Sequence, residues 1–187
     1  MNPGDGLPAC SGWFDWDEEV TEHLATYLSA LRVHGSSSLE FNPVHSQVYD
    51  ADVGLTLTLD VVDTRRRCVL RTLRVDCSPF QIVCGEDETH QFTTPLDPRS
   101  HSYFVSPSGS ERPLAAADVV ASWLRQEALR PIHLHQWQRG RRWLHEYFLA
   151  DTRRSLSWGA SAKGKELSGE PPTAIIPVVT TKARLRT

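Results

Sequence analysis

Hydrophobic residues recur at helical spacing near the start of the chain. They lie on one stripe of an α-helix, at Val20, Leu24, Tyr27, Leu28 and Leu31. The acidic run that begins at Asp15 lies at the positive end of the helix dipole, and Arg32 lies near the negative end. Gly35 predicts the end of the helix, because glycine readily adopts the left-handed conformation of a helix stop. We therefore expect a helix with one buried face.

From Leu39 the pattern changes to the alternation of β-strands. Leucine and valine alternate with more polar residues from Leu55 to Val62, which is typical of a strand with one face in the core. Residues 69–77 predict its antiparallel neighbour, although Arg71 interrupts the apolar face, and residues 63–66 predict the hairpin loop between them. The stretch 39–49, bent or broken at a proline, is a candidate further strand.

The second half of the chain predicts one more helix and a hairpin. Pro113 and Pro131 bracket a helix over about 115–129. Residues 132–149 predict a hairpin around a Gly/Arg turn, in a register that places His133 and His135 on one face. The segment between 78 and 113 is polar and rich in proline, so it is either a functional loop or contains strands that the pattern does not resolve.

Together these elements predict an α+β fold, with a mainly antiparallel sheet, two helices and a C-terminal β-hairpin. We expect a flexible lead over residues 1–14 and a single domain over 15–158. The C-terminal extension, 159–187, contains an apolar stretch that is a candidate edge strand, followed by a mobile basic tail.

Charge is distributed unevenly along the 187 residues, although the formal net charge is only -3. Residues 1–60 carry ten acidic side chains and one basic side chain, a net of -9. Residues 61–130 are balanced, and residues 131–187 carry ten basic and four acidic side chains, a net of +6. Because the two ends differ in sign, they either pair with each other inside the fold or each forms a contact surface for a partner of opposite charge.

The acidic front predicts a non-enzymatic protein-binding module that engages a basic protein partner, of the inhibitor or immunity-protein type. Aromatic residues beside the acids would supply apolar anchors. The expected contact residues are Trp13, Phe14, Trp16, Asp17, Glu18, Glu19 and Glu22. This interpretation is an argument from class, because no family motif accompanies it.

Two alternatives rest on the C-terminal hairpin. His133, His135 and Glu146 would share one face of it, and two imidazoles with a carboxylate are a known ligand set, which indicates a metal-dependent enzyme. Nucleic-acid binding is the other alternative, because aromatic residues accompany the arginines of the turn. Those arginines are Arg139, Arg141 and Arg142. The acidity of the front half argues against this second alternative.

The cysteines and the motifs that are absent narrow the class of protein further. The four cysteines match no zinc or redox spacing, which favours reduced thiols and a cytoplasmic location. Cys77 and Cys84, with His90 following, are a candidate thiol nucleophile and base, with Cys84 expected in a loop, although buried inert cysteine is the commoner state. Neither phosphate-binding glycine motifs nor a nucleophile elbow occur, so we expect no cofactor. A signal peptide and a membrane-spanning segment are not expected, and the oligomeric state stays open.

Overall fold

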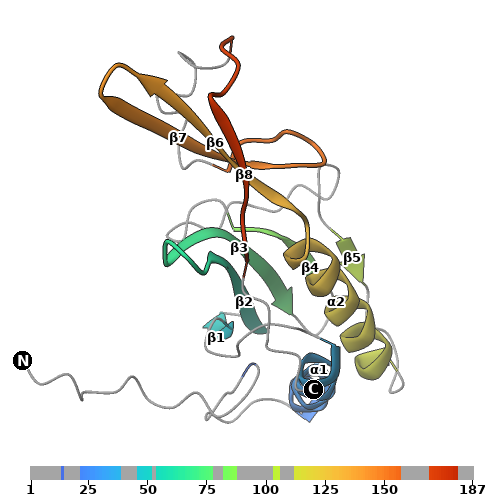
Figure 1. Cartoon of the computed structure of the whole chain (residues 1–187). Helices are drawn as coiled ribbons and strands as arrows, with labels where there is room; N and C mark the ends of the chain where they lie inside the picture. The colour runs from blue at the N-terminus through green and yellow to red at the C-terminus, as the bar shows by residue number, and fades with distance from the viewer. Residues whose placement is uncertain are drawn as a thin grey trace, which may run out of the picture.

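The structure is a computed structural model whose described residues form two antiparallel sheets and two helices, which confirms the α+β class (Figure 1). It describes Phe14 and residues 22–38, 46–51, 54–77, 82–87, 103–105, 112–156 and 169–180.

The first sheet has five strands in the order β1-β2-β3-β4-β5, all antiparallel to their neighbours. The strands are β1 (Ser46–Ala51), β2 (Gly54–Asp63), β3 (Cys68–Cys77), β4 (Ile82–Glu86) and β5 (Tyr103–Val105). The alternation predicted for β2 is confirmed, because its leucines and Val61 are buried on one face. A register shift between Val61 and Val62 lets β3 bury Leu70, Arg71 and Thr72 in succession.

Strand β4 corrects the expectation that Cys84 lies in a partly exposed loop. Cys84 pairs with Val75 of β3 and its side chain has no exposed surface. Ile82 and Cys84 alternate toward the core, while Gly85 contributes no side chain to the pattern. A strand of five residues that includes a glycine gives too few positions for its alternation to be recognised in the sequence.

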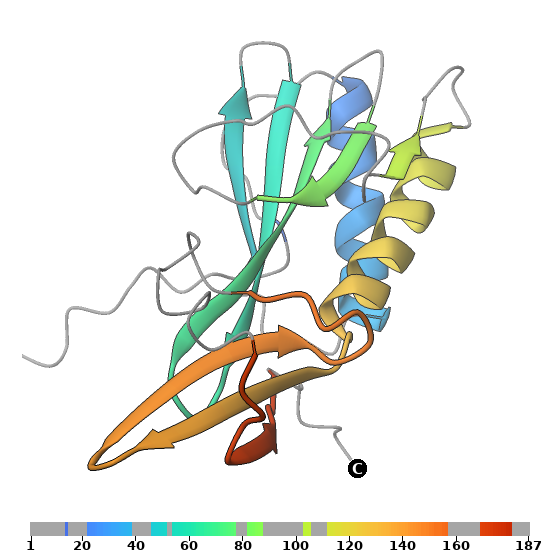
Figure 2. The same ribbon diagram turned by 90° about the horizontal axis from the view of Figure 1, so that it is seen from above.

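Helices α1 (Glu22–Ser38) and α2 (Arg112–Ala128) pack against each other and against one face of the first sheet (Figure 2). The expected stop at Gly35 is wrong, because α1 continues to Ser38, and one glycine in a helix costs only about 1 kcal/mol. Tyr27 and Leu31 of α1 and Leu124 of α2 are buried in the same core as the inward leucines of β2. Among the described residues, no helix is long and apolar enough to cross a membrane.

The second sheet has the order β7-β6-β8 and consists of β6 (Ile132–Arg139), β7 (Arg142–Leu149) and β8 (Ala174–Pro177). The predicted hairpin register is confirmed, since His135 faces Glu146 and Arg139 faces Arg142 across a two-residue turn. Gly140 has a φ of 61° at the first turn position, the conformation that a type II′ turn requires there.

The chain after β8 joins the two sheets. The Val178 amide donates to the Ile132 carbonyl at 2.9 Å, which continues the pairing of β8 with β6. The Thr64 amide, in the β2–β3 turn, donates to the Val179 carbonyl at 3.2 Å. The β6–β7 hairpin crosses the end of the first sheet near this turn and extends beyond it (Figures 1 and 2).

Candidate functional site

The acidic aromatic segment lies largely outside the described residues, which include only Phe14 and Glu22 from it. Phe14 has no exposed surface, its amide donates to Ser46 Oγ at 3.2 Å, and its carbonyl accepts from Arg32 Nε at 3.0 Å. This corrects the expectation that Phe14 is an exposed anchor, because its ring belongs to the hydrophobic core. Glu22 is exposed in the first turn of α1. The residues of this segment that fall outside the description are Trp13, Trp16, Asp17, Glu18 and Glu19.

The histidine face of the hairpin is an aromatic surface. His135 stacks against Phe148, with ring centroids 4.5 Å apart, and lies 5.9 Å from the Trp137 ring. Burial and the neighbouring His133 lower the pKa of His135, which favours the neutral imidazole. Glu146 accepts a hydrogen bond from a serine hydroxyl beyond β7. Among the described residues, these three included, no group of three or more His, Cys, Asp or Glu is placed to hold a metal ion.

The turn of the hairpin presents arginines to solvent. Arg141 and Arg142 are exposed, and Arg139 pairs with Glu170 at 2.7 Å. Next to the turn, the Trp143 side chain keeps 51% of its surface exposed. The outer half of the hairpin therefore combines cationic groups with an exposed indole ring.

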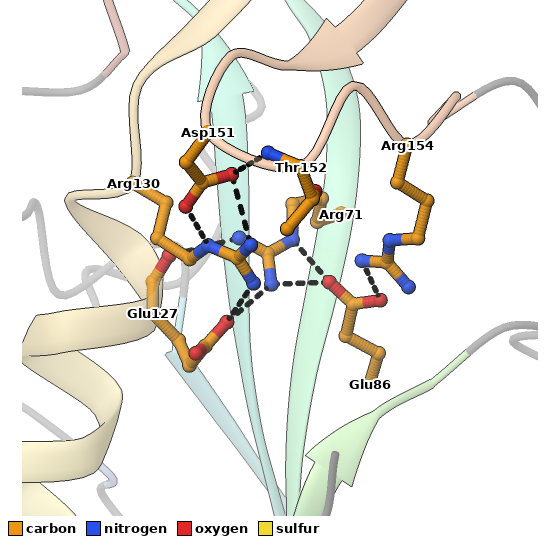
Figure 3. A network of polar contacts seen from close by, with 7 residues as sticks. All are labelled: Arg71, Glu86, Glu127, Arg130, Asp151, Thr152 and Arg154. Atoms are coloured by element: carbon orange, nitrogen blue, oxygen red, sulfur yellow. Dashed lines mark hydrogen bonds and ion pairs between the residues drawn. The ribbon is translucent and has the colours of Figure 1, made fainter. Parts of the chain in front are cut away.

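The root of the hairpin is fixed by a network of ion pairs that links both sheets to α2 (Figure 3). Arg71 of β3 is almost fully buried and binds carboxylates of Glu86 and Glu127, the latter at 2.7 Å. Arg130, just after α2, pairs with Asp151 at 2.8 Å, and Arg154 binds the second oxygen of Glu86. The loop after β7 is thus tied to the first sheet through shared carboxylates.

Two carboxyl groups of this network, those of Glu127 and Asp151, favour their ionised forms. Burial alone would raise the pKa of Glu127, but the hydrogen bonds from Arg71 and Arg130 outweigh it and lower the pKa. Hydrogen bonding from Arg130 lowers the pKa of Asp151 to about 2. Glu127 and Asp151 therefore stay charged at neutral pH.

A second link joins the hairpin to the β2–β3 turn. The Tyr147 hydroxyl of β7 donates to the buried Asp63 carboxylate at 3.0 Å and lies 3.7 Å from Cys68 Sγ. Asp63 also accepts from the amides of Arg65 and Arg66, at 2.9 and 3.0 Å. Burial would raise the pKa of Asp63, but these hydrogen bonds lower it, so the carboxylate stays charged and holds the turn in place.

Arginines also surround the β2–β3 turn. Arg65 and Arg67 are exposed, and Arg66 pairs with Asp63 at 3.3 Å. Figures 1 and 2 show this turn and the tip of the β6–β7 hairpin toward the same side of the molecule. Exposed arginines therefore occur at two turns, whereas the sequence indicated only the C-terminal one as a candidate site.

The two cysteines that were candidates for a thiol nucleophile, Cys77 and Cys84, lie in the core. Burial raises the pKa of Cys77 to about 12, and it raises the pKa of Cys84 as well. Both side chains are at most 3% exposed, so neither forms a reactive thiolate at neutral pH. His90, the base suggested for them, lies outside the described residues.

Comparison with protein-family models, with curated proteins and with solved structures found no match. Function is therefore inferred from the geometry of the described residues. Sequence reasoning missed the Arg71 network, although one signal was present, because an arginine on an apolar strand face requires buried carboxylate partners.

Proposed function

We propose that this protein is a non-enzymatic protein-binding module that contacts its partner through the outer half of the β6–β7 hairpin. The observation that carries this proposal is the exposed Trp143 ring beside Arg141 and Arg142 on a hairpin that extends beyond the first sheet. Tryptophan and arginine are enriched among the residues that dominate protein interfaces. A large apolar ring that folding leaves in water is available for burial by a partner.

The support beneath the hairpin favours a binding role. Its root is held by the Arg71 network and by the hydrogen bond from Tyr147 to Asp63. A surface that is already ordered loses less conformational entropy on association, so more of the contact energy contributes to affinity. The hairpin therefore suits recognition better than a flexible loop of the same composition would.

The finer proposal is an inhibitor or immunity-type module in the cytoplasm. Free thiols at Cys68, Cys77 and Cys84 are consistent with a reducing compartment. The acidic residues around Glu22 are proposed as a second contact, for a basic region of a partner. This second contact no longer includes Phe14, whose ring is buried.

Co-purification from the native cells tests the proposal. The tagged full chain should retain a protein partner, and Trp143→Ala should reduce retention at least tenfold, as expected for an interface residue of this kind. Val33→Ala is a matched control, because Val33 is 66% exposed on α1, and it should retain the partner normally. Equal retention by the Trp143→Ala and Val33→Ala variants would remove the hairpin from the proposal.

Charge reversal separates the two proposed contacts. The Arg141→Glu/Arg142→Glu variant should lose a partner that binds the hairpin, whereas Asp17→Lys/Glu18→Lys/Glu19→Lys should lose one that binds the acidic segment. Retention of the same partner by both variants contradicts a charge-guided interface of either kind.

Nucleic-acid binding is a second candidate, favoured by the exposed arginines of two turns on the same side of the molecule, with Trp143 available for stacking. Under this alternative, an oligothymidylate should bind with an affinity that falls steeply as salt increases. Under the protein-binding proposal, the same oligonucleotide should show no mobility shift at physiological ionic strength.

A further inference from the structure

The outer edge of β7 carries backbone groups that no described residue binds. In an antiparallel hairpin, facing residues alternate between hydrogen-bonded and non-hydrogen-bonded pairs. With Arg139 and Arg142 closing the two-residue turn, the amide and carbonyl groups of Trp143 and His145 point away from β6. Within the part of the chain that the structure describes, these outward groups have no hydrogen-bond partner.

Nearer the root, the same edge already carries an added extended segment. Tyr147 and Leu149 occupy the next outward positions of the same alternation. The Tyr147 carbonyl accepts from the Leu156 amide at 2.8 Å, and the Leu149 amide donates to the Arg154 carbonyl at 2.9 Å. Extended chain therefore fits this edge of β7, and the described chain covers only its inner half.

Charge and exposure indicate what fits the outer half of this edge, which no described residue covers. Arg141 and Arg142 flank it and are exposed. Glu146, the one acid of β7 itself, already accepts a hydrogen bond from Ser155. A partner segment at this edge would lie beside positive charge and beside the Trp143 ring, which is 51% exposed. Acidic residues in that segment would complement the positive charge of this edge.

We propose that the outer half of β7 binds an acidic, extended segment of a partner protein as an added antiparallel strand. This inference rests on the proposed protein-binding function and adds its mode and partner class. Backbone hydrogen bonds to Trp143 and His145 provide the pairing, and the indole ring and the arginines select the sequence of the added strand.

A synthetic probe tests the mode directly. The peptide acetyl-Thr-Glu-Val-Glu-Val-Glu-Thr-amide is titrated into the full chain, with its Lys-for-Glu counterpart as the charge control. The acidic peptide should bind at least tenfold more tightly than the basic one. Amide hydrogen exchange in the unaltered protein should slow at Trp143 and His145, whereas Leu144 and Glu146, whose amides face β6, should change little.

A matched pair of variants isolates the backbone contribution. His145→Pro removes one outward amide and no hydrogen bond to β6, and proline is tolerated in this position of an edge strand. Loss of one hydrogen bond should weaken peptide binding about fivefold, while His145→Ala, which keeps the amide, should stay within about twofold of the parent. The exchange measurement on the unaltered protein gives a result even if His145→Pro folds poorly.

The outcomes distinguish strand addition from the proposed protein-binding function on which it rests. If neither amide is protected, or if His145→Pro binds as well as His145→Ala, strand addition is wrong. The protein-binding function still stands if Trp143→Ala releases a co-purified partner. A further outcome is that the protein self-associates, that His145→Pro abolishes this self-association, and that the acidic peptide does not bind. That result would show that a second copy of the chain occupies the edge, and it would overturn the acidic partner. Salt-sensitive oligothymidylate binding that blocks the peptide would overturn it in favour of nucleic acid.

Discussion

Arg71 is a buried cation on an otherwise apolar strand face, and its neighbours explain why the fold tolerates it. Its side chain is 2% exposed, and Glu86 and Glu127 approach it from β4 and α2. It also donates to the Glu127 carbonyl at 2.9 Å at the end of the helix. A charge taken out of water in this way stays bound only while its partners remain charged and in place.

Replacing Arg71 by alanine should lower the free energy of unfolding by about 3 kcal/mol, because two partly buried carboxylates lose their cation. The matched control is Arg74→Ala on the same strand, whose partner Asp76 is 38% exposed. That change should cost at most about 1 kcal/mol. Urea unfolding measures both, and equal costs for the two variants would contradict the role assigned to Arg71.

Acid should destabilise the protein through the carboxyl groups of the Arg71 network and of the hydrogen bond from Tyr147 to Asp63. The pKa values of Asp63 and Glu127 are lowered in the folded state, and that of Asp151 falls to about 2. The unfolded chain therefore binds more protons between its ordinary carboxyl pKa and these lowered values, and stability falls as pH falls through that window.

The pH dependence is measured by chemical unfolding between pH 7 and pH 2. The parent protein should lose stability steadily below about pH 5. The Asp63→Asn/Glu127→Gln variant should start less stable and show a flatter profile, since fewer carboxyl groups change charge. Parallel profiles for the two proteins would show that these groups do not carry the dependence.

At the scale of elements, the β6–β7 hairpin was predictable because its local chemistry and its alternation agree. The two-residue turn needs a positive φ at its first position, and Gly140 supplies it at 61°. The short turn then fixes the register, including the pairing of His135 with Glu146. Strand β2 was predictable because its inward positions repeat every second residue from Leu55 to Val61, whereas β3 keeps this pattern only from Leu73 to Cys77.

The turn can be tested by adding one methyl group. Gly140→Ala should destabilise the hairpin by about 1 kcal/mol through backbone strain alone, since an added Cβ meets nothing within 4 Å. Gly169→Ala is the matched control, with equally open surroundings but no positive φ, and should be nearly neutral. Amide exchange across β6 and β7 reports the difference. Similar exchange in both variants would contradict a strained turn.

Elements that depend on distant partners could not be predicted. Strand β4 pairs with β3 and covers the core, yet Gly85 interrupts its short pattern. Helix α1 passes its glycine because tertiary packing against α2 outweighs a weak local preference. The burial of Phe14 depends on contacts with Ser46 and Arg32, and the sequence does not reveal such pairings.

For the whole molecule, the structure shows where part of the positive charge of the C-terminal region lies. The described ion pairs of the hairpin region use carboxylates close to it, with Arg139 bound to Glu170 and Arg154 bound to Glu86. Arg141 and Arg142 remain exposed at the tip, beside Trp143. The described arginines of the hairpin tip thus form an exposed positive surface on a supported hairpin, and this is the basis of the proposed function.

The most direct test is amide hydrogen exchange of the full chain with and without the protein partner recovered from its native cells. The account predicts that protection on binding is concentrated at residues 141–146, with Trp143 and His145 slowed most. Protection confined to the acidic segment around Glu22, or spread over both helices with the hairpin unchanged, would contradict it.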